Sequence, residues 1–213
     1  MYKYILFDLD GTLTNPKEGI TKCVQYALAK FNIEADTESL LGYIGPPLHW
    51  SFTHFHNISP KDAPKAVEYY RERYSKIGIF ENLLIPGFDT VLKALKDKGH
   101  ILAVSTSKPT VFARQILDEY KVSQYFDAII GSELDGSRTE KAEVIEYTLE
   151  TLNITNKDSI IMVGDRSYDV LGAAKLGIPT IGVTFGFAKE GELEKAGAKY
   201  IVTCPDEIID IVS

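Results

Sequence analysis

The sequence predicts an α/β protein whose core is a doubly wound parallel sheet and which carries a small all-helical insert. Two patterns support this fold class. Short runs of apolar and β-branched residues alternate with amphipathic stretches of helical periodicity, which is typical of parallel strands covered by helices on both faces. The alternation stops between Phe7 and Ile101, where no convincing strand pattern occurs and helical periodicity dominates.

Composition narrows the classes of function. The 213 residues suffice for one large domain, or for a core domain with a smaller companion. The net charge of −7 argues against a nucleic acid or an anionic membrane as partner, because both attract basic surfaces. No apolar run reaches the length of a membrane span, and Cys23 and Cys204 form no C-x-x-C pair. We expect a cytoplasmic protein, either a monomer or a homodimer.

Short apolar runs predict the strands of the sheet in chain order. They are Tyr4–Phe7, Ile101–Ser105, Ala128–Ile130, Ile160–Val163, Thr180–Thr184 and Tyr200–Thr203. Amphipathic stretches between them predict helices, of which the clearest are Asp89–Lys98, Pro109–Tyr120, Glu140–Leu152 and Tyr168–Leu176. Gly99 and Gly177 follow two of these stretches, at the place where glycine commonly ends a helix.

The interval without strands predicts a separate helical domain. We expect residues 15–84 to form this domain, inserted after the first strand with hinges near Thr14 and Pro86. Residues 1–14 and 85–213 then form the core domain. An insert at this position can close over whatever binds at the end of the first strand.

Two short patterns predict where helices of the insert begin. Asn15-Pro16 with Glu18 matches a capping residue, a proline at the first helical position and an acid at the third. Ser59-Pro60 predicts the start of a second helix.

Asp8 and Asp10 follow the first strand directly, in the stretch DLDGTLT. Residues two apart in an extended chain point to the same side, so the two carboxylates crowd each other. Such crowding raises the energy of the ionised pair unless a positive charge lies nearby. A pair of anions at the end of an apolar strand therefore indicates a functional site.

Other polar residues end neighbouring strands, and the carboxyl ends of parallel strands share one edge of the sheet. Thr106 and Ser107 follow the second predicted strand and fit either a phosphate-binding turn or a plain helix cap. Asp165 and Asp169 follow the Ile160–Val163 strand, and each alone also fits a helix start. Together with Asp8 and Asp10, they offer the hard oxygen ligands that suit Mg²⁺.

These residues match, in order, the four motifs of the haloacid dehalogenase superfamily, whose phosphatase members the chain resembles. Asp8-Leu9-Asp10-Gly11-Thr12 matches the first motif, D-x-D-G-T. Thr106 fits the second motif, Lys141 the lysine of the third, and Gly164 to Asp169 the fourth, G-D-x-x-x-D. Without the resemblance, the sequence around Lys141 would favour an exposed surface charge at this position. The resemblance implies a Rossmann-like core with a helical cap.

Within the superfamily the chain resembles the phosphoglycolate phosphatase-like and 5′-nucleotidase-like members, which carry a helical cap between the first and second motifs. The stretches Gly45-Pro46-Pro47-Leu48 and Ser137-Arg138-Thr139-Glu140-Lys141 resemble this subgroup in particular. Lys141 departs from the K-P-x-P form common in phosphoglycolate phosphatases, so the resemblance does not select one substrate.

The resemblance implies a two-step reaction on a small phosphorylated metabolite. Asp8 attacks phosphorus and becomes an aspartyl phosphate, while Asp10 protonates the leaving oxygen and later activates water. Mg²⁺ is held by Asp8, by the backbone carbonyl of Asp10 and by Asp165. Thr106, with the Ser107 backbone N–H, contributes to phosphate binding.

The remaining site residues take supporting roles in the same resemblance. Lys141 also binds the phosphoryl group, and Gly11 gives the phosphate-binding loop room to bend. Thr12 helps to position Asp10. Asp169 supports the metal ligands or orients Lys141.

The helical insert is expected to select the substrate through Gly45, Pro46, His49 and Trp50. These residues form a rigid turn that leads into a helix. A plain connection between two helices is the alternative. Trp50 either stacks on a ring of the leaving group or belongs to the core of the insert.

The sequence therefore predicts a Mg²⁺-dependent phosphatase for a monoester resembling phosphoglycolate or a nucleoside monophosphate. Three alternatives remain on the same fold: a phosphotransferase or phosphomutase, an inorganic pyrophosphatase, and a non-catalytic regulator that binds phosphate or Mg²⁺. A dehalogenase is disfavoured because Asp10 is present, and by resemblance dehalogenases lack this second aspartate.

Overall fold

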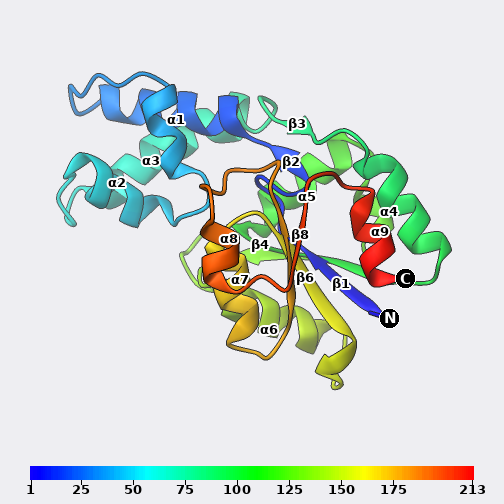
Figure 1. The fold of residues 1–213 in the computed structure, drawn as a ribbon. Helices are drawn as coiled ribbons and strands as arrows, with labels where there is room; N and C mark the ends of the chain where they lie inside the picture. The colour runs from blue at the N-terminus through cyan, green and yellow to red at the C-terminus, as the bar shows by residue number, and fades with distance from the viewer. The chain divides into compact units, whose positions relative to one another are not determined.

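The computed structural model describes residues 1–213 as two compact units (Figure 1). The sheet unit comprises Met1–Asn15 and Leu84–Ser213, and the helical unit comprises Pro16–Leu83. None of the helices combines the length and apolar character that a membrane span requires.

The sheet unit is built on six parallel strands in the spatial order β5-β4-β1-β6-β7-β8. The chain winds outward from β1 in both directions, first through β4 to β5 and then through β6 to β8, as the colours of Figure 1 let the reader follow. The predicted doubly wound parallel sheet is confirmed. The strands are β1 (Tyr4–Phe7), β4 (Ile101–Pro109), β5 (Ala128–Ser132), β6 (Ile160–Gly164), β7 (Thr180–Val183) and β8 (Tyr200–Val202).

Six helices accompany this sheet, with short 3₁₀ turns at Ser123–Tyr125 and Lys157–Ser159. They are α4 (Phe88–Asp97), α5 (Thr110–Glu119), α6 (Lys141–Thr151), α7 (Ser167–Ala174), α8 (Glu192–Ala196) and α9 (Glu207–Val212). Strand β4 continues four residues beyond its predicted end, and α5 begins only at Thr110. Thr106 and Ser107 therefore lie in extended backbone, which excludes their interpretation as helix caps.

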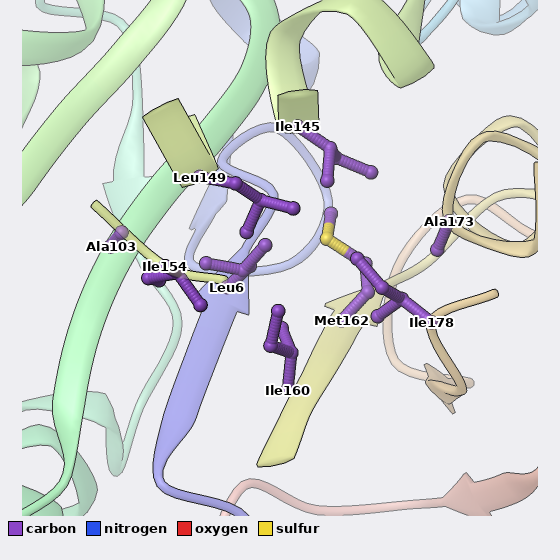
Figure 2. Packing of buried hydrophobic residues seen from close by; sticks show 9 residues of the cluster. All are labelled: Leu6, Ala103, Ile145, Leu149, Ile154, Ile160, Met162, Ala173 and Ile178. Atoms are coloured by element: carbon purple, nitrogen blue, oxygen red, sulfur yellow. The ribbon is translucent and has the colours of Figure 1, made fainter. Parts of the chain in front are cut away.

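The core of the sheet unit lies on both faces of β1, whose last three residues are fully buried. Leu6 packs on one face with Ile145 and Leu149 of α6, as Figure 2 shows. Phe7, on the other face, makes edge-to-face contact with Phe88 of α4, with ring centroids 6.1 Å apart. Because successive side chains of a strand point to opposite faces, α6 and α4 cover opposite sides of the sheet.

The helical unit contains three α-helices, a 3₁₀ helix (Glu38–Tyr43) and a π-helical turn (Tyr74–Gly78). The α-helices are α1 (Lys17–Ala29), α2 (Leu48–His56) and α3 (Ala63–Arg73). The buried side chains of α1 recur at helical spacing, which explains why this segment forms a helix against its neighbours.

Two predicted helix starts in this region are corrected. Helix α1 begins at Lys17 with Pro16, not Asn15, in the capping position. Asn15 instead ends the two-residue strand β2 (Thr14–Asn15), which pairs with β3 (Leu83–Leu84). Helix α3 begins at Ala63, after a turn in which the Ser59 hydroxyl accepts the backbone N–H of Asp62 at 3.1 Å.

Candidate active site

The DLDGTLT stretch forms a tight turn directly after β1. The carbonyl of Leu9 accepts the backbone N–H groups of Thr12, Leu13 and Thr14 at 2.9–3.2 Å. Gly11 has a φ of +85°, a conformation that disfavours side chains. A Cβ on Gly11 would also lie 2.1 Å from Oδ2 of Asp165. The glycine is thus required both by the turn and by the approach of this loop to β6.

Asp8 and Asp169 share the ammonium group of Lys141. Lys141 is the first residue of α6, and its Nζ lies 2.8 Å from Asp8 Oδ1 and 2.8 Å from Asp169 Oδ1. It also donates to the carbonyl of Ser105 in β4 at 3.1 Å. The side chain is only 5% exposed, so the interpretation of Lys141 as a surface charge is excluded.

Asp165 is completely buried at the end of β6. Its Oδ2 accepts the backbone N–H of Phe187 at 2.7 Å, and its Oδ1 accepts the Thr12 hydroxyl at 3.4 Å. Thr12 thus donates to Asp165, whereas the sequence led us to expect that it positions Asp10. The loop after β7 passes so close that a Cβ on Gly186 would lie 2.4 Å from Oδ2 of Asp165.

Asp10 has a lysine of its own, which the sequence analysis missed. Nζ of Lys108 lies 2.8 Å from Asp10 Oδ2, and the two side chains are 5% and 14% exposed. Lys108 follows Thr106 by two residues in extended backbone, and residues two apart in a strand point to the same side. This spacing was the signal in the sequence that Lys108 faces the site together with Thr106.

The second-motif residues lie where β4 meets β5. Thr106 is buried, and its hydroxyl accepts the backbone N–H of Lys108 at 3.3 Å. The carbonyl of Ser107 accepts the hydroxyl of Ser132 at 2.8 Å. Thr106 and Ser107 therefore lie in the last part of β4, the strand that neighbours β1 on one side, while Asp165 directly follows β6, the strand on the other side.

Burial and crowding set the protonation behaviour of the carboxylates. Burial raises the pKa of Asp165 well above its usual value, and the charges of Asp169 and Asp8 raise it further. Burial likewise raises the pKa of Asp169, although Lys141 opposes this. Burial also raises the pKa of Asp10, against the charge of Lys108. The site thus holds more negative charge than its own cations neutralise.

A divalent cation fits this arrangement. Asp8, Asp165 and Asp169 each offer a carboxylate oxygen, and these oxygens lie within 4.8 Å of one another. Four carboxylates share two ammonium groups, so the ionised site has two uncompensated negative charges. Hard oxygen donors with such an excess of charge suit Mg²⁺. The side chain of Asp10 lies outside this group because it pairs with Lys108.

The candidate specificity residues belong to the helical unit. Gly45 has a φ of +107°, and Pro46 is buried in the turn before α2. His49 and Trp50 are exposed in the first turn of that helix. Trp50 stacks on His54 with ring centroids 4.3 Å apart, and it is 44% exposed. The alternative that Trp50 belongs to the core of this unit is therefore wrong.

Comparison with known proteins identifies the family. The family model described as "Haloacid dehalogenase-like hydrolase" matches residues 5–183. The chain belongs to this family. The match begins within β1 and ends with β7, so it includes all the carboxylates and lysines described above.

The proteins similar to this haloacid dehalogenase-like hydrolase include two that carry the names of a 5′-nucleotidase and a phosphatase, and one that carries the name of a kinase. A protein of Pseudomonas aeruginosa named 5′-nucleotidase is 47% identical over 90% of this chain and 87% of its own length. The solved structure of a "predicted phosphatase from Clostridium acetobutylicum" is 50% identical, covers 100% of this chain and 98% of its own, and has a TM-score of 0.96. The tyrosine-protein kinase PtkA of Mycobacterium tuberculosis is 35% identical over 92% of this chain and 67% of its own length. The resemblance to the phosphatases of this family is confirmed.

Proposed function

We propose that the protein is a Mg²⁺-dependent phosphatase that hydrolyses small phosphate monoesters through an aspartyl phosphate on Asp8. The observation that supports this best is the separate environment of the two aspartates after β1. Asp8 shares Lys141 with Asp169, whereas Asp10 pairs with Lys108 alone. Two carboxylates in different surroundings can take different roles, one as nucleophile and one as proton carrier.

The reaction proceeds in two steps on these residues. A carboxylate oxygen of Asp8 forms a bond to phosphorus while the bond from phosphorus to the leaving oxygen breaks. Asp10 gives its proton to that oxygen and then takes a proton from the water that attacks the aspartyl phosphate. Inorganic phosphate leaves, and both aspartates return to their starting state.

Three groups at the same edge bind the phosphoryl oxygens. The Thr106 hydroxyl and the Ser107 backbone N–H donate hydrogen bonds, and the ammonium group of Lys141 supplies positive charge. Asp8 and Asp165 hold Mg²⁺, with Asp169 beside them. When bound, the ion offsets the repulsion between the Asp8 carboxylate and the phosphate dianion.

The substrate class that we favour is a nucleoside 5′-monophosphate. The relative named 5′-nucleotidase supports it, as does the exposed ring of Trp50, because a flat aromatic surface suits a nucleobase. We propose that the segment from Gly45 to Trp50 distinguishes such a leaving group from phosphoglycolate or pyrophosphate.

The test is phosphate release from a panel with Mg²⁺ present and after chelation. The panel contains nucleoside monophosphates, phosphoglycolate, sugar phosphates, pyrophosphate and 4-nitrophenyl phosphate. We expect preference for one class of ester, loss of activity in chelator and recovery with Mg²⁺. Asp8→Asn should reduce turnover by at least about 10³-fold while the circular dichroism spectrum is retained. Turnover by Asp8→Asn near that of the wild type would remove Asp8 as nucleophile.

Binding of the ion is tested without turnover. Mg²⁺ should raise the melting temperature of the wild-type protein, because a ligand of the folded state stabilises it. Asp165→Asn should weaken this shift. An equal shift in both proteins would contradict the assignment of Asp165 as a metal ligand.

Phosphoryl transfer is a second candidate, favoured by the similarity to PtkA. An aspartyl phosphate can pass its phosphoryl group to an alcohol or phenol instead of water. The two outcomes are separated by supplying labelled substrate together with a tyrosine-containing protein. Label in tyrosine would favour transfer, and label only in inorganic phosphate would favour hydrolysis.

A further inference from the structure

Lys108 lies outside the four motif positions, yet it is buried against Asp10. Its ammonium group lies 2.8 Å from Asp10 Oδ2, and only 5% of its side chain is exposed. Lysine is rarely buried to this degree without a specific anionic partner. Its position therefore needs an explanation within the chemistry of the site.

The backbone around Lys108 is shaped to bring it there. The pairing of β4 with β5 is regular up to Ser105 and resumes at Pro109, with a shift of register between them. Such irregularities redirect side chains and are frequent beside active sites. The carbonyl of Lys108 lies so close to β5 that a Cβ on Gly131 would be 2.1 Å from it. The hydrogen bond from the Ser132 hydroxyl to the Ser107 carbonyl, at 2.8 Å, fixes the same segment.

The two oxygens of Asp10 differ as a result. Oδ2 is held by Lys108, whereas Oδ1 is buried and has no hydrogen-bond partner. A buried carboxylate oxygen without a partner is costly for stability, so its retention points to use in function. Lys141 does not take over this role, because its ammonium group lies against Asp8, Asp169 and the carbonyl of Ser105.

We propose that Lys108 is a positioning residue for Asp10. It holds Oδ2, so that Oδ1 is the oxygen that gives the proton to the leaving group and later receives one from water. This inference rests on the proposed function, in which Asp10 is the proton carrier. The two lysines then have separate roles: Lys141 binds the phosphoryl group, and Lys108 positions the residue that protonates the leaving group.

Two esters separate positioning of a proton donor from other roles. The phenolate of 4-nitrophenyl phosphate departs without a proton, whereas the ribose oxygen of adenosine 5′-monophosphate needs one. The ratio kcat/KM reports only the steps up to release of the alcohol, so it isolates this proton transfer. The later attack of water is common to both esters and enters kcat alone.

Lys108→Met should therefore lower kcat/KM for adenosine 5′-monophosphate by about 10²-fold and change it little for 4-nitrophenyl phosphate. Asp10→Asn should show the same selectivity. The double variant should be no worse than Asp10→Asn alone, because the two residues act as one unit. Lys96→Met is the matched control, since that ammonium group pairs with Asp127 at the same 2.8 Å but on an exposed part of the sheet unit.

Each other outcome overturns the proposal in a recognisable way. Equal losses on both esters, with Asp10→Asn still selective, would make the pair structural. A rise in KM confined to substrates with a second anionic group would assign Lys108 to substrate binding. An Asp10→Asn variant without selectivity would remove the proton-transfer role of Asp10 itself, and with it the proposal. Lys108→Gln, which keeps an N–H donor, serves as the second variant if Lys108→Met does not fold.

Discussion

Glu192 is expected to be among the largest single contributors to stability near the site. Its Oε1 accepts hydrogen bonds from Arg166 Nε at 2.9 Å, Ser167 N at 2.9 Å and the Ser167 hydroxyl at 3.0 Å. Its Oε2 accepts the backbone N–H of Lys189 at 3.0 Å. One carboxylate thus joins the start of α7 to the loop that follows β7. Glu192→Ala removes all four hydrogen bonds at once.

The magnitude follows from two routes. A hydrogen bond to a charged group contributes about 1.5–3 kcal/mol, but the four bonds share one partly buried carboxylate and water replaces some of them in the variant, so we expect about 3 kcal/mol in total. Burial alone would raise the pKa of Glu192, but the N–H groups of Ser167 and Lys189 and the Arg166 side chain hold it at about 2. The difference from the usual value of 4.5, reduced for solvent screening, corresponds to about 2 kcal/mol at pH 7.

The sign of the pH dependence follows from the lowered pKa. The contribution of Glu192 is fully present above the pKa of the unfolded chain, near 4.5, and it is lost as the pH falls toward 2. The difference in unfolding free energy between the wild type and Glu192→Ala should therefore be constant from pH 7 to 5. By pH 3 it should have decreased to about half.

The assay is denaturant and thermal unfolding followed by far-UV circular dichroism, because the single tryptophan lies in the helical unit and reports on that unit. A loss of 2–3 kcal/mol corresponds to about 4–12 °C for a protein of this size. Asp97→Ala is the control, since Asp97 forms only an exposed ion pair with Lys93 and its removal should leave the midpoint unchanged. The error of such a measurement is about 1 °C. A melting midpoint for Glu192→Ala that equals the wild-type midpoint within this error would refute the reasoning.

Three further changes test the fold, the loop and the helical unit. Gly11→Ala should lower phosphate release by about 10²-fold, because its Cβ would lie 2.1 Å from Asp165 Oδ2, and wild-type rates would contradict this close approach. Leu6→Ala should lower the unfolding free energy by about 3–5 kcal/mol in denaturant titration. The ratio of the rates on adenosine 5′-monophosphate and 4-nitrophenyl phosphate should stay the same, and a changed ratio would show that packing at Leu6 affects the active site. Trp50→Ala should raise KM for adenosine 5′-monophosphate about tenfold and leave KM for phosphoglycolate, which has no ring, unaffected, and equal effects on both would make Trp50 merely structural.

The sheet could be predicted because its strands are buried on both faces. Ile5, Leu6 and Phe7 are all fully buried, so β1 reads as an unbroken apolar run instead of an alternating one. Runs of this kind, separated by helical periodicity, leave few alternatives to a parallel sheet. The edge at which Asp8 and Asp165 meet then follows, because ligands of doubly wound sheets bind at the carboxyl ends of the strands.

Local signals failed where pairing over long range decided the conformation. Asn15 has the side chain of a helix cap, yet it lies in β2, and the pairing of β2 with β3 moves the start of α1 to Lys17. Lys141 has no local signal of burial either. Only the packing of the start of α6 against β1 and α7 surrounds it with Asp8 and Asp169, and the motif resemblance was needed to select it.

Lys108 is a residue of the site that none of the four motifs includes, although the sequence contained a pattern that could have identified it. A lysine at the end of a buried strand either extends to solvent or meets an anion, and Thr106 two residues earlier already marked that side of β4 as facing the site. What the sequence could not supply is the choice of anion. That choice depends on the shifted register between β4 and β5 and on the absence of a side chain at Gly131, both of which are set by a distant segment. The pairing of Lys108 with Asp10, and not with Asp8 or Asp169, is therefore a property of the folded sheet.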